Sequence, residues 1–292
     1  MTFRGPLLSL LWLAAAVPAA GGGGQRVAAV LSSPGGAYLD AFSAFQAAYG
    51  SSVPSFDASK GVPELPPGTR IVVTFGTRAA SAGYPPGVRV VYAMAPGLIL
   101  RGTEPGGHVK IRMDRRFAET LAVLKRLQPG LRELRVFWAA PGYADYWDDA
   151  KAAGAKTGVT LTPVRVRNID DLPGLLRAGL GKMDAFWLPP DPLLITPESL
   201  MIFRQFSWDN GIPMYASTKG LTREGACASV GVSFSEMGAA AARTVLDMEA
   251  GRAVQPFVFP ARTELTLNSG AARRCGIALT DDILRQASNL FP

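Results

Sequence analysis

The sequence predicts an α/β protein made of two similar lobes, each built on a doubly wound parallel sheet. Two observations indicate this fold class. Short apolar runs typical of buried strands alternate along the chain with segments at helical spacing, and the order of these elements repeats once. The clearest unit, a strand, a helix and a second strand, spans residues 184–220.

That unit shows the signals of each element in turn. The apolar run Asp184–Leu188 is typical of a buried strand. A helix then begins at Thr196, a hydroxyl N-cap followed by Pro and Glu, and ends at Gly211. A second buried strand follows at Ile212–Ala216. Polar residues come just past both strand ends, at the edge where open parallel sheets bind ligands.

The same order of elements occurs earlier in the chain. The segment LSSPGGAYLDAF, which begins at Leu31, matches WAAPGYADYWDD, which begins at Trp138, at an offset of 107 residues (138 − 31). The unit at 184–220 likewise matches residues 71–94. The remaining predicted strands lie at 26–31, 53–56, 71–75, 88–93, 134–138, 159–166, 225–230 and 264–267, and the remaining predicted helices at 38–49, 143–157, 170–180, 233–251, 268–276 and 280–287.

Residues 1–20 have the pattern of a secretory signal peptide. Arg4 supplies a positive charge, Leu7–Val17 form an apolar core, and small residues allow cleavage near Ala19 or Ala20. The apolar run is shorter than the ~20 residues of a membrane span, although an N-terminal anchor is the alternative. We therefore expect an exported, periplasmic protein.

Composition excludes several functions. The net charge of +7 is spread along the chain without interleaved aromatic residues, so no nucleic-acid partner is predicted. His108, the single histidine, lies in a Gly-rich segment, which excludes His-based triads and multi-His metal sites. We therefore predict no catalytic residue, no metal site and no cofactor. Cys227 and Cys275 either pair in an oxidising compartment or stay as buried free thiols.

Several segments together resemble a known family. They are LRVFWAAPGY, DAFWLPPDPLLITPES, GIPMYASTKGLTREGACASVGVSFSEMG and TELTLNSGAARRCGIAL. The chain is similar to the extracytoplasmic substrate-binding proteins of ABC importers, within the branch that includes tryptophan- and tyrosine-binding receptors. The resemblance implies two lobes joined by three chain crossings, a ligand cleft between them, an ABC permease as partner, and no catalysis.

The pieces after residue 224 are too few to form a third lobe, so we expect them to complete the first two. The N-terminal lobe is predicted at residues 25–110 and 225–256, and the C-terminal lobe at residues 111–224 and 257–292.

A zwitterionic amino acid would need donors for its carboxylate, an acid for its ammonium and a pocket for its side chain. Asp191 follows a strand and matches an acid of the family pattern, so it is the predicted ammonium partner; a turn-forming Asp before Pro192 is the alternative. Thr77 and Ser217 are candidates for binding the ligand carboxylate, and helix capping is the alternative role of their hydroxyl groups. The remaining ligand-binding candidates are Ser32, Ser33, Gly76 and Thr218 for the carboxylate, Met94, Tyr143 and Tyr146 for the side chain, and Ser229 on a crossing strand.

The resulting hypothesis is a monomeric periplasmic receptor that closes its two lobes on a small ligand and then docks on an ABC permease. A sensor of the same fold that feeds a signalling partner is the alternative. A third hypothesis is an exported enzyme, but the sequence lacks the acid–base groups that such an enzyme would need.

Overall fold

The structure, a computed structural model, describes residues 1, 26–100, 107–113, 116–141, 143 and 147–292. The predicted signal peptide falls outside these ranges except for Met1. Within them, no helix combines the length and the apolar character that a membrane span requires.

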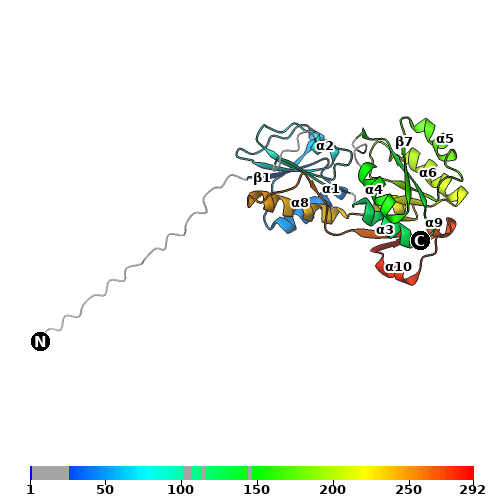
Figure 1. Ribbon diagram of the computed structural model, residues 1–292. Helices are drawn as coiled ribbons and strands as arrows, with labels where there is room; N and C mark the ends of the chain where they lie inside the picture. The colour runs from blue at the N-terminus through cyan, green and yellow to red at the C-terminus, as the bar shows by residue number, and fades with distance from the viewer. Residues whose placement is uncertain (2–25, 101–106, 114–115, 142, 144–146) are drawn as a thin grey trace.

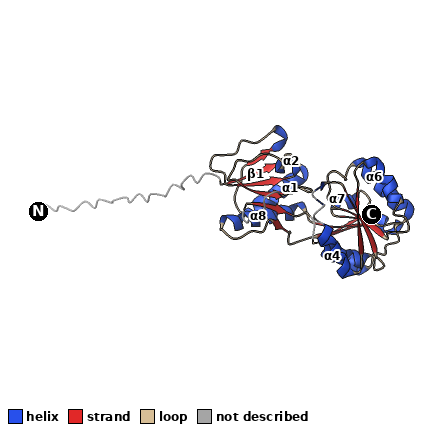
Figure 2. Ribbon diagram, turned by 45° about the horizontal axis from the view of Figure 1, so that its top comes forward, coloured by secondary structure: helices blue, strands red, loops and turns tan. Residues whose placement is uncertain are grey.

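The described strands form two sheets, which lie in two lobes side by side (Figures 1 and 2). The strands of the first sheet are β1 (Val27–Leu31), β2 (Ser55–Asp57), β3 (Ile71–Phe75), β4 (Arg89–Ala93), β5 (His108–Ile111) and β11 (Phe257–Val258). Those of the second are β6 (Glu133–Trp138), β7 (Thr160–Arg165), β8 (Ala185–Leu188), β9 (Met214–Ala216), β10 (Ala228–Gly231), β12 (Glu264–Asn268) and β13 (Asn289–Phe291).

Strand order confirms the predicted fold class. The first sheet has the order β11-β5-β4-β3-β1-β2, and all its pairs are parallel. The second has the order β13-β12-β10-β9-β8-β6-β7, in which β10 and β12 form the one antiparallel pair among the described strands. Continuous burial of strands such as β1, β3 and β8 is typical of parallel sheets that are covered on both faces.

Helices cover both faces of the first sheet. The helices α1 (Gly36–Tyr49) and α8 (Phe234–Glu249) pack together on one face, and α2 (Thr77–Ala80) lies on the other. Gly238 of α8 sets the distance between the two long helices, because a Cβ there would overlap the backbone oxygen of Ala41. The large side chains of this core, Phe45 and Phe75, meet edge to face.

The second sheet is covered in the same way. One face packs against α3 (Phe117–Leu127), α4 (Trp147–Thr157), α9 (Ser269–Arg274) and α10 (Asp281–Gln286). The other packs against α5 (Leu172–Arg177), α6 (Pro197–Asn210) and α7 (Lys219–Arg223). Trp138 and Trp187 are buried on the face that α3 and α4 cover.

Helix α6 begins and ends as predicted. The Thr196 side chain accepts a hydrogen bond from the backbone N–H of Ser199, and the Ser199 side chain accepts one from that of Thr196, which forms a capping box. Gly211 ends the helix in the left-handed region at φ 61°.

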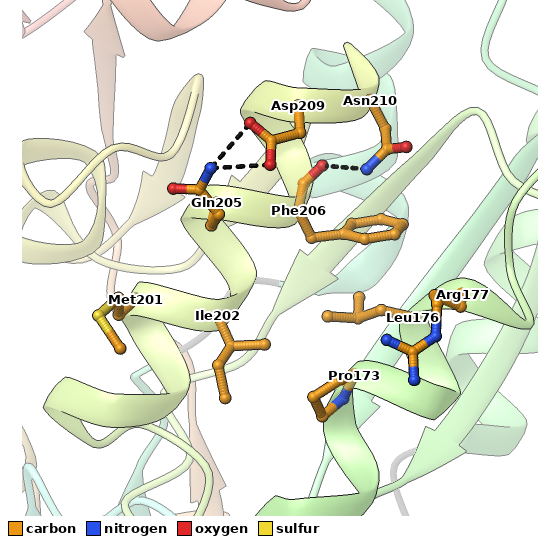
Figure 3. Close-up of a pocket in the computed structure, with 9 residues that line it drawn as sticks. All are labelled: Pro173, Leu176, Arg177, Met201, Ile202, Gln205, Phe206, Asp209 and Asn210. Carbon is orange, nitrogen blue, oxygen red and sulfur yellow. Dashed lines mark hydrogen bonds between the residues drawn. The ribbon is translucent and has the colours of Figure 1, made fainter.

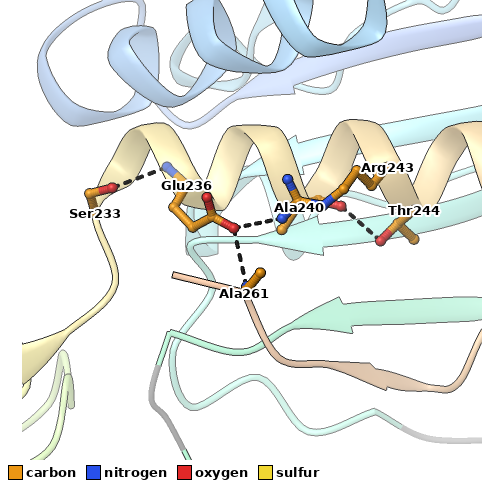
Figure 4. A network of polar contacts seen from close by, with 6 residues as sticks. All are labelled: Ser233, Glu236, Ala240, Arg243, Thr244 and Ala261. Atoms are coloured by element: carbon orange, nitrogen blue, oxygen red, sulfur yellow. Dashed lines mark hydrogen bonds and ion pairs between the residues drawn. The ribbon is translucent and has the colours of Figure 1, made fainter. Parts of the chain in front are cut away.

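The chain passes between the two sheets three times: between β5 and α3, between β10 and α8, and between β11 and β12. The second and third crossings are joined by Glu236, which is 8% exposed (Figure 4). Its Oε1 accepts hydrogen bonds from Arg243 at 2.6 Å and from the backbone N–H of Ala261 at 3.1 Å. The first and third crossings are joined by Arg112 and Arg116, whose guanidinium groups lie 5.5 and 5.1 Å from the ring centroid of Phe259.

Two strands lie on the other side of the predicted lobe boundaries. We assigned residues 225–256 to the N-terminal lobe, yet β10 pairs with β9 and β12 in the second sheet. We assigned residues 257–292 to the C-terminal lobe, yet β11 pairs with β5 in the first sheet. The chain therefore crosses between the lobes after β10 and again after β11. The apolar pattern of the sequence marks these segments as strands but does not say with which sheet they pair. His108, predicted in a Gly-rich loop, begins β5.

Candidate functional site

The topology marks one site on each sheet. In the first sheet β1 lies between β2 and β3, and in the second β6 lies between β7 and β8. The loops that leave β1 and β3, and those that leave β6 and β8, therefore diverge toward opposite faces of their sheet. Ligands of open α/β sheets bind outside the carboxyl ends of the strands at such switch points.

These two strand edges face one another. Gly97, in the loop after β4, adopts φ +73°, and a Cβ built on it would lie 3.2 Å from the Cβ of Ala140, after β6. The same position lies 4.0 Å from Cδ of Pro192, after β8. A loop of the first lobe is thus in contact distance of both switch-point loops of the second lobe.

In the first lobe, the structure brings Ser32 and Gly76 together. The Ser32 hydroxyl is buried and accepts a hydrogen bond from the backbone N–H of Ala79 at 3.0 Å, which ties the loop after β1 to α2. Gly76 adopts φ +100°, and a Cβ there would overlap the Ser32 side chain. Ser33 is half-buried, and Thr77 is exposed as the first residue of α2.

Met94 directly follows β4 and is the one non-glycine residue with positive φ among the described residues, at 55°. Such a conformation is uncommon for a residue with a side chain and marks a constrained backbone. Its side chain is 5% exposed and packs into the core of the first lobe. Met94 therefore packs into the first-lobe core, whereas we expected its side chain to form a wall of the ligand pocket.

In the second lobe, Asp191 joins the two switch-point loops. The carboxylate is fully buried, and Oδ2 accepts hydrogen bonds from the backbone N–H groups of Ala139 at 2.6 Å and Ala140 at 2.8 Å. Oδ1 accepts from Leu193 at 2.9 Å and Leu194 at 3.2 Å. All four contacts are made within the protein, so they match the alternative of a turn-forming Asp and do not direct the carboxylate toward a ligand ammonium.

Tyr143 strengthens the same junction. Its hydroxyl donates to the backbone oxygen of Pro190 at 2.8 Å, and its side chain is 6% exposed. Tyr146, the other predicted aromatic wall, lies outside the described residues.

The strand ends of β9 and β10 bring the remaining candidates together. A Cβ on Gly231, the last residue of β10, would overlap the backbone oxygen of Ser217, the first residue after β9. The Ser217 hydroxyl is buried and has no hydrogen-bond partner among the described residues. Thr218 is the half-buried N-cap of α7 and makes no side-chain cap. Ser229 is buried within β10, opposite Ala216 and Thr266.

A hollow with a volume of about 380 Å³ lies between α5 and α6, away from the strand ends (Figure 3). Its floor is apolar, with Leu176, Ile202 and Phe206. Three of its polar residues bond within α6: Gln205 donates to Asp209, and the Asn210 amide donates to a backbone oxygen of that helix. It offers no converging free polar groups of the kind that orient a small ligand.

The two cysteines are buried free thiols that interact with each other. This contact lowers the pKa of Cys275 to about 7 and raises the pKa of Cys227 well above its usual value. The Ser207 hydroxyl, 3.4 Å from Sγ of Cys275, also lowers the pKa of Cys275.

A comparison with protein-family models identifies the family of this chain. The family model described as ABC transporter substrate binding protein matches residues 94–290. The chain belongs to this family. Its members bind small-molecule ligands outside the cytoplasm and interact with membrane permeases, and they are receptors, not enzymes. A comparison with curated protein sequences gave no significant match.

Several solved structures have the same fold as this chain, and the similarity extends over nearly their full length. An ABC domain in complex with L-Trp from Streptococcus pneumonia is 17% identical, with a TM-score of 0.67, covering 92% of this chain and 100% of that chain. The ligand-free, open structure of a substrate-binding protein with adhesive properties from Clostridium difficile is 15% identical, with a TM-score of 0.69, covering 91% and 99%. A conserved domain protein from Vibrio cholerae is 16% identical, with a TM-score of 0.65, covering 90% and 98%.

Proposed function

We propose that this ABC substrate-binding protein is the exported receptor of an importer, and that it captures a small ligand, an amino acid, between its two lobes. The observation that carries the proposal is the contact between strand ends. The loop after β4 reaches the loops after β6 and β8, so a ligand at the switch point of the second lobe would lie beside a loop of the first lobe. The receptor acts as a monomer in the periplasm, after cleavage near Ala19 or Ala20.

Closure of the two lobes would couple binding to transport. A ligand that contacts both strand edges gains its full set of interactions only when the lobes are closed, so it shifts the population toward the closed form. The three crossings supply the hinge, and the contacts of Glu236 and of Phe259 make them move as a unit. The membrane permease would then recognise the closed form.

An amino acid is supported as the ligand class by two features. The L-Trp complex from Streptococcus pneumonia has the same fold over 92% of this chain. The Ser217 hydroxyl is buried at a strand end without a partner among the described residues, and buried polar groups are normally hydrogen-bonded. Ser32, Ser33, Gly76, Thr77 and Thr218 lie at the matching strand ends and complete the candidate set.

A thermal-shift screen tests the proposal. The protein is stripped of ligand by partial unfolding and refolding and then screened with the amino acids, aromatic acids, purines and short peptides. A ligand present at a concentration 100 times its dissociation constant stabilises the folded state by about 2.7 kcal/mol. That stabilisation raises the midpoint temperature of unfolding by several degrees. We expect a selective shift with an amino acid. No shift with any amino acid at millimolar concentration would contradict the proposed ligand class.

A further inference from the structure

We propose that Cys227 and Cys275 form a redox site, at which an oxidant of the disulfide class joins their sulfur atoms in a disulfide bond inside the second lobe. In the structure both are reduced thiols. The family to which the chain belongs acts outside the cytoplasm, where disulfide bonds form and persist. The inference goes beyond ligand capture and does not depend on which ligand the receptor binds.

Separate contacts place the two cysteines at the same end of β9. The backbone N–H of Cys227 donates to the oxygen of Met214, the first residue of β9, at 2.8 Å. Sγ of Cys275 lies 3.4 Å from Oγ of Ser207, and that hydroxyl donates to the oxygen of Ile212, two residues before β9, at 2.7 Å. Both cysteines belong to the core on the face of the second sheet that α9 covers. The two thiols therefore converge from different segments of the chain.

The backbone that carries each thiol is fixed. The oxygen of Cys227 accepts a hydrogen bond from the N–H of Asn268 at 3.0 Å, which continues the pairing of β10 with β12. Asn268 is also the N-cap of α9, where its side chain accepts from the N–H of Ala271 at 2.8 Å. Cys275 is the C-cap of the same helix, and its N–H donates to the Ala271 oxygen at 3.1 Å. One short helix thus connects the strand partner of Cys227 to Cys275.

The two thiols also interact directly. Their side-chain interaction is the largest influence on the pKa of each cysteine. One thiol acts on another in this way only at contact distance. A disulfide cannot form where two cysteines are too far apart or where their side chains point away from each other. Neither obstacle applies to side chains that are in contact.

Cys275 is the thiol that reacts first. Its pKa is lowered to about 7 by the interaction with Cys227, the Ser207 hydroxyl and the Arg274 guanidinium, so a sizeable share of it is thiolate near neutral pH. The thiolate is the form that attacks a disulfide. Cys275 is 8% exposed and Cys227 is 1% exposed, so an incoming oxidant meets Cys275 before Cys227.

The reaction is an exchange in two steps. Sγ of Cys275 attacks one sulfur of the oxidant, which forms a mixed disulfide and releases the first thiolate of the oxidant. Cys227 then loses its proton, and its Sγ attacks Sγ of Cys275 while the bond to the oxidant breaks and the second thiolate leaves. The two cysteines have given up two electrons and two protons, and the disulfide of the oxidant has been reduced to two thiols.

The bond would close a long loop that visits the other lobe. The two cysteines are 48 positions apart (275 − 227), and α8, β11 and the second and third crossings lie between them. Both ends of this loop are in the second lobe, so the bond leaves rotation of the lobes free. Closing such a loop restricts the unfolded chain and thereby stabilises the folded state.

Thiol counting after oxidation tests the site. The folded protein is treated with oxidised glutathione, then unfolded in the presence of N-ethylmaleimide and analysed by mass spectrometry. We expect no maleimide adduct and a mass about 2 Da below that of the reduced chain, because the new bond removes two hydrogen atoms. Peptide mapping should find residues 227 and 275 in one linked pair. The reduced chain is the control and should take up one maleimide group at each cysteine.

Thermal unfolding with and without reductant gives a second readout. The oxidised wild-type chain should melt about 5–10 °C above the reduced one, whereas Cys227→Ser and Cys275→Ser should each melt at one temperature in both conditions. Maleimide on both cysteines after the glutathione treatment would overturn the proposal. So would a glutathione that stays on Cys275, because it would show that Cys227 cannot reach the mixed disulfide. An oxidised wild-type chain that melts with the reduced one would contradict the stabilising role of the bond.

Discussion

Asp191 is a buried carboxylate whose charge is met by the backbone. Burying a charge is costly unless hydrogen bonds replace its hydration, and here each carboxylate oxygen accepts two backbone N–H groups. Two of the donors follow β6 and two follow β8, so one side chain fixes the geometry between loops that leave their sheet in opposite directions.

Replacing Asp191 with Ala should therefore destabilise the fold. Four backbone N–H groups would lose their acceptor, two of them in buried contacts and two in partly buried ones, and each unsatisfied buried group costs about 1–3 kcal/mol, partly recovered by water. We expect the free energy of unfolding to fall by roughly 3 kcal/mol or more in urea denaturation. Asp40→Ala, at an exposed position of α1, is the control and should stay within about 0.5 kcal/mol of wild type. Wild-type stability in Asp191→Ala would show that these bonds contribute little.

The sequence predicts this residue's importance and leaves its role open. The turn-forming alternative is visible in the Asp-Pro pair, because it depends on neighbouring residues. The bonds to Ala139 and Ala140 join residues 52 and 51 positions apart, and no local pattern reveals such a pairing.

Among the elements, the α1–α8 pair shows how a single glycine permits close packing. At Gly238, a Cβ would overlap the Ala41 oxygen and crowd the Phe45 nitrogen, both of which are backbone atoms that no side-chain rotation can move. The two helices could accept a methyl group there only by separating, and that would loosen the first-lobe core.

Gly238→Ala should lower the free energy of unfolding by about 1–3 kcal/mol, the cost of overpacking, despite the better helix propensity of alanine. Gly174→Ala in α5 is the matched control, since a Cβ there meets no atom within 4 Å. That variant should be neutral or more stable by up to about 1 kcal/mol. Thermal unfolding of both variants checks the pair, and equal midpoints would contradict the packing argument.

Elements with strong local signals were predictable, and elements defined by distant partners were not. The capping residues of α6 and the buried runs of β1, β3 and β8 are present in the sequence as such. The short edge strands β11 and β13 have two and three residues and exist through pairing with β5 and β12. Helix α3 was not predicted, although its buried positions Phe117, Leu121 and Leu124 have a helical spacing in the sequence.

At the scale of the whole molecule, the internal repeat predicts two lobes but cannot assign the residues after 224 to either one. The final strands return to both sheets, which makes each lobe discontinuous and produces the three crossings. The crossings are joined to one another through Glu236 and Phe259, so rotation of one lobe has to carry all three segments. This arrangement supports hinge closure on a ligand at the facing strand ends.

Hydrogen exchange of the ligand-stripped protein, with and without the compound that gives the largest thermal shift, tests the central claim most directly. We predict that ligand protects backbone amides in both lobes together: residues 32–35, 76–80 and 94–98 of the first, and residues 139–141, 191–195 and 217–218 of the second. The hollow between α5 and α6 should exchange at the same rate in both states. Protection confined to one lobe, or centred on α5 and α6, would contradict capture of the ligand between the lobes.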